Sequence, residues 1–107
     1  MSDFIFNVLD QSPVTSATNP AHAVAETVAL AEHTDKLGYR RFWLAEHHNP
    51  SACAGAAPEI LIGHIAARTQ HLRVGSGGIM LPHYSPMKVA EVFRMLETLA
   101  PKRIDLG

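Results

Sequence analysis

The sequence is poor in the features that mark several function classes. It has one cysteine, Cys53, so no disulfide can form within the chain, and a reducing, cytoplasmic location is the simple expectation. Its formal net charge of −1 provides no basic surface, so we expect no nucleic-acid partner. No apolar run approaches the ~20 residues of a membrane helix, and the first residues lack a signal-peptide layout. We therefore expect no membrane partner.

The chain instead shows apolar segments that alternate with amphipathic ones. Its 107 residues, 47% of them hydrophobic, suffice for the core of one domain. We expect strands at 4–9, 41–45, 72–76 and 103–106, and helices at 20–37, 58–69 and 86–100. Asn19-Pro20 and Ser85-Pro86 are each typical of an N-cap followed by proline at the first helical position. The order β-α-β-α-β-α-β predicts an α/β fold with parallel strands.

The apolar spacing also predicts which helix faces are buried. In the first helix, Val24, Val28 and Ala31 are expected to face the core, with Leu30 and Leu37 beside them. The expected core positions of the third helix are Val89, Val92, Phe93, Leu96 and Leu99. The second helix is apolar nearly all round, at Ile60, Leu61, Ile62 and Ile65. We expect it to be covered on more than one side, by the core or by a second subunit.

The repeat length predicts a barrel. About 35 residues per strand–helix unit fit a (β/α)₈ TIM barrel, which typically needs ~250 residues. The 107 residues are less than half of that number. We therefore expect residues 1–107 to form the N-terminal half of a (β/α)₈ barrel, as a truncated chain or a fragment.

The candidate active site is the segment 41–50, RFWLAEHHNP. An apolar strand runs into Glu46, His47 and His48, and Pro50 then prevents further strand pairing. Active sites of α/β proteins lie at this carboxyl edge of the sheet. Because histidine titrates near neutrality, the two histidines are candidate acid/base groups. The alternative is a polar strand end with two solvated imidazoles.

Two further interpretations stay open on the residues alone. Glu46, His47, His48 and His83 are a candidate ligand set for a metal-dependent hydrolase, although adjacent histidines in an extended segment point to opposite sides. The second interpretation is that the chain is a non-catalytic, self-associating half-barrel. His83 follows the third strand, where it would line a substrate entrance. We expect Cys53 to be a small buried thiol rather than a nucleophile.

Three motifs together resemble the luciferase-like, flavin-dependent monooxygenases: AEHHN after the second strand, GSGGIMLPHYSP after the third, and the final RIDLG. The resemblance covers almost the whole chain. It implies a (β/α)₈ barrel, usually a dimer, that uses reduced FMN or a deazaflavin. It further implies O₂ and a small organic molecule as substrates, with a flavin reductase as the source of reduced flavin.

The resemblance also assigns roles to individual residues. His47 matches the catalytic histidine of the family, and His48 matches its neighbour, which also affects activity. Glu46, Gly77 and Gly78 are assigned to the cofactor site. The resemblance places a non-proline cis peptide at Gly77-Gly78, against the flavin ring; the alternative is a plain bulge or turn. The family's phosphate-contacting arginine has no counterpart in residues 1–107, so we expect weak FMN binding and no catalytic competence.

Overall fold

The computed structural model describes residues 3–107 as one parallel sheet with helices between its strands. The elements, in chain order, are β1 (Asn7–Asp10), α1 (Pro20–Lys36), β2 (Arg41–Leu44), α2 (Pro58–Arg68), β3 (Arg73–Ser76), the short 3₁₀ helix η1 (Leu81–His83), α3 (Pro86–Leu99) and β4 (Ile104–Leu106). The strand order is β1-β2-β3-β4, and every neighbouring pair is parallel. The predicted α/β alternation is confirmed.

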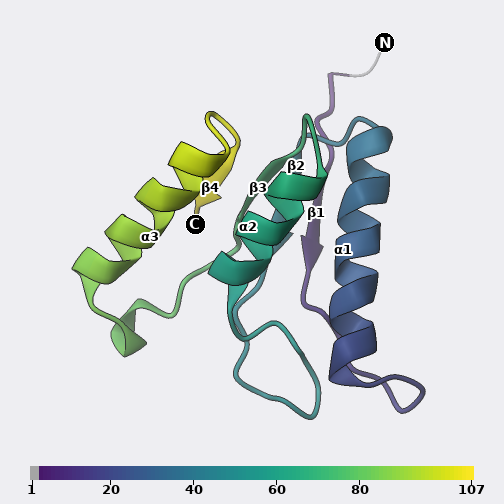
Figure 1. The fold of residues 1–107 in the computed structure, drawn as a ribbon. Helices are drawn as coiled ribbons and strands as arrows, with labels where there is room; N and C mark the ends of the chain where they lie inside the picture. Colours follow the sequence, from purple (N-terminus) through teal and green to yellow (C-terminus); the bar gives the residue numbers. More distant parts are fainter. Residues whose placement is uncertain (1–2) are drawn as a thin grey trace.

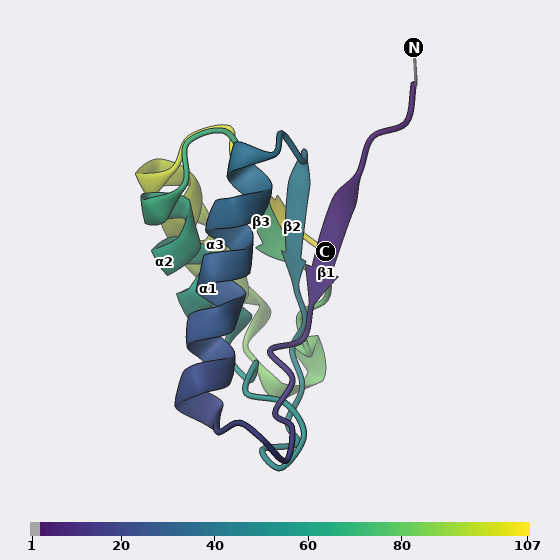
Figure 2. The same cartoon turned by 90° about the vertical axis from the view of Figure 1, so that its right-hand side faces the viewer.

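All three helices cover the same face of the sheet (Figures 1 and 2). A doubly wound sheet would place helices on both faces, whereas the wall of a (β/α)₈ barrel has helices only on its outer side. The one-sided arrangement therefore agrees with the barrel prediction. It also leaves the second face of the sheet without helical cover within residues 3–107.

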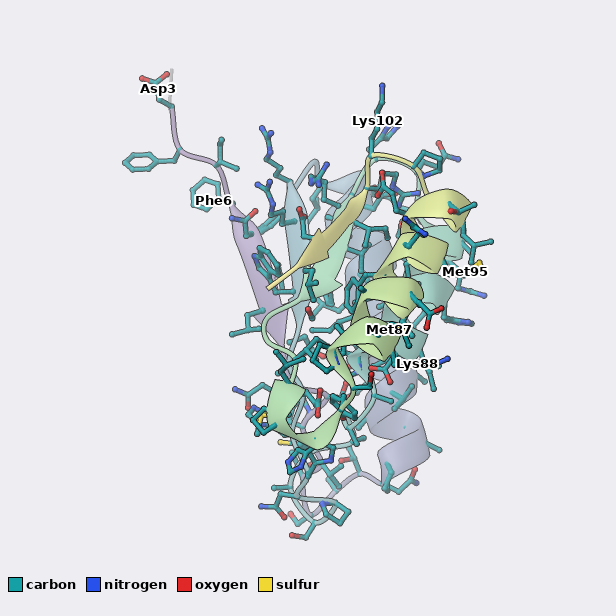
Figure 3. The ribbon with its side chains drawn as sticks, turned by 90° about the vertical axis from the view of Figure 1, so that its left-hand side faces the viewer. Asp3, Phe6, Met87, Lys88, Met95 and Lys102 are labelled. Carbon is teal, nitrogen blue, oxygen red and sulfur yellow. The ribbon has the colours of Figure 1, made fainter. Side chains whose placement is uncertain are left out.

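The first strand is shorter than predicted, because β1 begins at Asn7 rather than at residue 4. Asn7 pairs with Arg41, the first residue of β2, so the preceding residues extend past the end of their neighbour. Figure 3 shows Asp3 and Phe6 on a segment that projects away from the sheet. Apolar composition predicted an extended conformation here, and the length of the neighbouring strand limits the pairing.

The core lies between the sheet and the helices. Phe42 and Leu44 of β2, Val74 of β3, and Ile62 and Ile65 of α2 are fully buried there. Because side chains alternate along a strand, the residues between them face the helix-free side of the sheet. This alternation assigns each strand residue to one of two faces.

The buried face of α1 differs from the predicted one. Its buried residues are Ala23, Thr27, Ala31 and Thr34, so of the predicted stripe only Ala31 is fully buried. The two threonine hydroxyls donate hydrogen bonds to the carbonyls of Ala23 and Ala31, at 3.1 and 2.9 Å. Small side chains with satisfied hydroxyls can be buried without apolar character, and a count of apolar residues does not detect such a face.

The other two helices bury one face each. In α2, Leu61, Ile62, Ile65 and Ala66 are buried, whereas Ile60 is 70% exposed. The core of this chain therefore covers three of the four predicted residues but not Ile60, and cover by a second subunit stays a prediction. In α3, Phe93 and Leu96 are buried but Leu99 is exposed. Leu99 is the last residue of α3.

The predicted helix starts are confirmed by their hydrogen bonds. The side chain of Asn19 accepts the amide of His22 at 2.9 Å, and Ser85 accepts the amide of Lys88 at 3.4 Å. After α1, Gly38 adopts a φ of 83°, a backbone conformation that favours glycine. No helix within residues 3–107 is long and apolar enough to cross a membrane.

Candidate functional site

The candidate site lies at the carboxyl edge of the sheet, where the segments after β2 and β3 meet. Parallel strands end at the same edge, so residues that are distant in the sequence become neighbours there. Glu46 follows β2, and the segment from Met80 to Tyr84 follows β3 and contains η1. In Figure 1 both segments lie at the same end of the molecule.

The carboxylate of Glu46 is the centre of this site. The residue is 6% exposed and accepts three hydrogen bonds. Its Oε1 accepts the Met80 amide at 3.1 Å, and its Oε2 accepts the Tyr84 hydroxyl at 2.6 Å and Nε2 of His48 at 2.5 Å. Burial by itself would raise the pKa of Glu46, but the bonds from Tyr84, His48 and the Met80 amide bring it below its usual value. Glu46 is therefore a buried carboxylate at neutral pH.

Tyr84 is the residue of this site that the sequence analysis missed. Its hydrogen bond to Glu46 raises the pKa of Tyr84 to about 12, so the hydroxyl remains a donor at neutral pH. The sequence did contain a signal for it, because Tyr84 is adjacent to His83, which was predicted to line a substrate entrance. A buried acid at one strand end needs donors from the neighbouring segment, and a tyrosine there is a natural candidate.

The two predicted catalytic histidines line one open pocket of about 750 Å³. The other residues lining this pocket are Pro20, Ala21, Val24, Asn49, Pro50, Cys53, Ala54 and Ala56. Only His48 contacts Glu46, and its ring also meets the ring of His83 edge-on at 5.7 Å. His47 is exposed, with its amide bonded to the Gly55 carbonyl at 2.9 Å. His48 is thus held in place, whereas the His47 side chain faces the solvent-accessible pocket.

Gly77 and Gly78 lie at the end of β3 but do not line this pocket. The Gly77 amide donates to the Leu44 carbonyl at 2.7 Å, and a Cβ on Gly77 would lie 3.1 Å from Cδ1 of Leu9. A Cβ on Gly78 would meet nothing within 4 Å. The absence of a side chain at Gly77 therefore lets the Leu9 side chain pack closely against this backbone.

The predicted cis peptide at Gly77-Gly78 is wrong for this structure, because no peptide bond within residues 3–107 is cis. A non-proline cis bond costs roughly 3–4 kcal/mol and persists only where its surroundings enforce it. The open space around Gly78 supplies no such constraint.

The metal-site interpretation has no geometric support. Within residues 3–107 no group of three or more histidine, cysteine, aspartate or glutamate side chains is arranged to hold a metal ion. The proposed set of Glu46, His47, His48 and His83 is divided, since only Glu46 and His48 are bonded to each other. Cys53 is also less buried than expected: it is half-buried and lines the histidine pocket.

The residues at this edge fit the ring of a flavin better than its phosphate. The largely apolar pocket beside His47 and His48 suits a planar ring. A phosphate needs cationic or amide donors. The three segments at the carboxyl edge, 11–19, 45–57 and 77–85, contain no lysine or arginine. Phosphate anchoring by a guanidinium or ammonium group is therefore absent from these segments.

The chain is similar in sequence to proteins of a known family. A family model described as luciferase-like monooxygenase matches residues 2–107. The chain is 52% identical to the N-acetyl-S-alkylcysteine monooxygenase of Bacillus subtilis over 101 residues, which are 94% of this chain and 30% of the relative. The chain thus spans about a third of the length of the curated relatives it matches.

Solved structures show the same fold. The structure of apo-MsnO8 matches 96% of this chain and 31% of its own length, with a TM-score of 0.94 and 54% identity. The oxygenating constituent of 3,6-diketocamphane monooxygenase from Pseudomonas putida, determined with FMN, matches 96% of this chain and 29% of its own. Its TM-score is 0.87 and its identity 19%, so that likeness concerns the fold alone. The predicted α/β barrel architecture is confirmed.

Proposed function

Because this chain belongs to the luciferase-like monooxygenase family, we propose that it carries part of the active site of a flavin-dependent oxidoreductase. The enzyme would use reduced FMN and O₂ on a small organic substrate. The observation that carries the proposal is the buried Glu46 carboxylate bonded to His48 at the edge of an open pocket. A carboxylate that orients an imidazole beside a pocket is an arrangement suited to acid/base chemistry.

Each site residue has a distinct role in this proposal. When bound, the reduced flavin supplies the electrons that activate oxygen. His47, exposed in the pocket, exchanges a proton with the reacting molecule. His48 lies beside it in an orientation that Glu46 fixes. Gly77 and Gly78 are the residues that would lie beside the flavin ring, and Glu46 would support that cofactor site by holding the segment that follows them.

The identity of the cofactor is a further part of the proposal. We favour FMN, with a deazaflavin as the alternative, because the chain resembles enzymes of this family and both cofactors have a planar ring that suits the apolar pocket beside the histidines. A separate flavin reductase would supply the reduced form. The substrate pocket, lined mainly by apolar atoms and two imidazoles, suits a small organic molecule.

Titration of FMN into the 107-residue chain, followed by flavin fluorescence, tests the cofactor assignment. A charge-assisted hydrogen bond contributes roughly 1.5–3 kcal/mol, so loss of two such bonds to phosphate weakens binding by about a hundredfold or more. We therefore expect weak binding at best and no turnover by this chain alone. A one-to-one complex of submicromolar affinity would contradict our placement of the phosphate anchor outside residues 1–107.

The reaction class is tested separately, in an enzyme that contains this chain within a whole barrel. We expect oxygen consumption that depends on both reduced flavin and substrate. Stoichiometric zinc with hydrolytic activity and no flavin dependence would contradict the proposal. A folded barrel that neither binds flavin nor turns over would favour the non-catalytic interpretation.

We further propose that the protein self-associates through the outer surface of α2. Ile60 is 70% exposed there and lines a groove between α1 and α2 with Val24 and Val28. The substitution Ile60→Glu should shift the molar mass from light scattering toward the monomer, because it places a charge in an apolar contact. Leu37→Glu is the matched control, since Leu37 is also exposed but lies outside this groove. A wild-type chain that is monomeric at high micromolar concentration would contradict the proposed self-association.

A further inference from the structure

Tyr84 and His48 meet on a single oxygen atom, although they come from segments after different strands. Both donate to Oε2 of Glu46, the hydroxyl at 2.6 Å and Nε2 at 2.5 Å. The side chain of Glu46 is only 1% exposed. Water therefore competes little for hydrogen bonds to Oε2. Because Tyr84 and His48 share this atom, the direction from which one of them donates limits the directions open to the other.

The segment after β3 fixes the orientation of the carboxylate. Met80 donates its amide to Oε1 at 3.1 Å, while Tyr84 occupies one position on Oε2. These two residues flank η1, so one short segment holds both oxygens of Glu46. His48 binds in the direction that the other two donors leave open.

This geometry selects one tautomer of His48. An ionised carboxylate can only accept hydrogen bonds, so Nε2 of His48 carries the proton and Nδ1 is the basic nitrogen of the neutral ring. The His83 ring lies edge-on to both neighbours, with centroids 5.7 Å from His48 and 6.2 Å from Tyr84. This packing opposes reorientation of the His48 ring.

We propose that Tyr84 is a positioning residue for His48. Its hydroxyl orients the Glu46 carboxylate so that His48 keeps the Nε2–H tautomer and offers Nδ1 as its basic nitrogen in the pocket. The consequence for catalysis rests on the flavin-dependent function proposed above, because His48 lines the pocket assigned to that reaction.

The ¹⁵N chemical shifts of the imidazole rings in the 107-residue chain test this role without any flavin. We expect the Nε2–H tautomer for His48 in the wild type, with its signals identified by their loss in His48→Gln. Tyr84→Phe removes one hydroxyl and keeps the ring. The ratio of Nε2–H to Nδ1–H should then fall, because the Glu46 carboxylate loses the donor that holds Oε2 in line with Nε2 of His48.

Tyr39→Phe is the matched control, since Tyr39 is half-buried against Phe6 and distant in the fold from this site. It should leave the His48 ratio unchanged. An Nδ1–H tautomer in the wild type would overturn the proposal. This measurement does not depend on the folding of any variant. An unchanged ratio in Tyr84→Phe would also overturn it.

The catalytic consequence is measured by steady-state kinetics of the whole enzyme. There, Tyr84→Phe should lower kcat about tenfold with little change in KM, because the hydroxyl acts on His48 rather than on the substrate. If the tautomer shifts as expected but the wild-type enzyme shows no flavin-dependent turnover, the proposed function fails and the positioning of His48 by Tyr84 stands. If turnover is present and the tautomer does not respond, the positioning role fails alone.

Discussion

Two carboxylates, Glu46 and Asp105, each accept several hydrogen bonds, and they differ in their donors. Glu46 accepts from a tyrosine, a histidine and a backbone amide at the carboxyl edge of the sheet. Asp105, in β4, is bound by two arginines from the amino ends of β2 and β3. Nε of Arg41 lies 3.2 Å from Oδ2, and Nη2 of Arg73 lies 2.7 Å from Oδ1.

The donor type separates the candidate functional site from a structural clamp. Arginine stays charged at every physiological pH. Burial would raise the pKa of Asp105, but Arg73 and Arg41 bring it below its usual value. The hydrogen bond that Arg73 donates to Asp105 raises the pKa of Arg73 in turn, against a smaller effect of burial. The Asp105 cluster therefore has fully charged donors, whereas the Glu46 cluster contains an imidazole, His48, that lines an open pocket.

The largest expected effect is on catalysis at the carboxyl edge. In the whole enzyme, His47→Ala should lower turnover by about 10²–10⁴-fold, the usual contribution of a general acid or base. The free energy of unfolding should change little, because His47 is exposed. Steady-state kinetics and urea denaturation measure the two quantities. His33→Ala, an exposed position on α1, is the control, and unchanged turnover in His47→Ala would move the catalytic role elsewhere.

The reverse pattern is expected for the arginine clamp. Asp105→Asn leaves Arg41 and Arg73 side by side without their counter-charge on a half-buried surface. Breaking a buried pair costs roughly 3–5 kcal/mol; partial exposure here reduces the expected loss of unfolding free energy to about 2–3 kcal/mol. Urea denaturation measures it, with the exposed Asp3 changed to asparagine as a control. Equal midpoints for the two variants would show that the clamp does not stabilise the fold.

A smaller effect is expected at Asp35, which joins α1 to the segment before β3. Its two carboxylate oxygens accept the amides of Gln70, His71 and Leu72 at 2.8–3.0 Å. Asp35→Asn replaces one acceptor by an NH₂ group, which should cost about 1–2 kcal/mol. Amide hydrogen exchange should report faster opening at these three residues and little change in β2. Equal acceleration throughout the sheet would mean that Asp35 supports the whole fold rather than this junction.

The smallest expected difference concerns pH. The pKa values of Glu46, Asp35 and Asp105 are all lowered: burial opposes the shift, and hydrogen-bond donors to each carboxylate outweigh it. Each group therefore contributes stability above its unfolded pKa of about 4. That contribution is lost as pH falls through the lower folded value. Unfolding free energy should thus decrease below about pH 4, and Asp105→Asn should show a shallower decrease than the wild type.

The features that the sequence predicted best are those set by short-range chemistry. Alternation of strand and helix, the caps at Asn19 and Ser85, and the position of Glu46, His47 and His48 after β2 all follow from neighbouring residues. The buried face of α1 was predicted less well, because it contains threonines whose hydroxyls donate hydrogen bonds to backbone carbonyls of the same helix. Apolar periodicity does not record such polar residues as core.

The sequence by itself therefore determined the parallel α/β order and the segment in which the site lies. Only the tertiary structure decided which groups meet. Tyr84 reaches Glu46 across 38 residues of sequence because parallel strands end at one edge. Arg41 and Arg73 share Asp105 because their strands are neighbours in register. Gly75 must lack a side chain because a Cβ there would lie 2.5 Å from the Asp105 carbonyl oxygen. Each of these depends on distances between strands, which no local pattern of residues encodes.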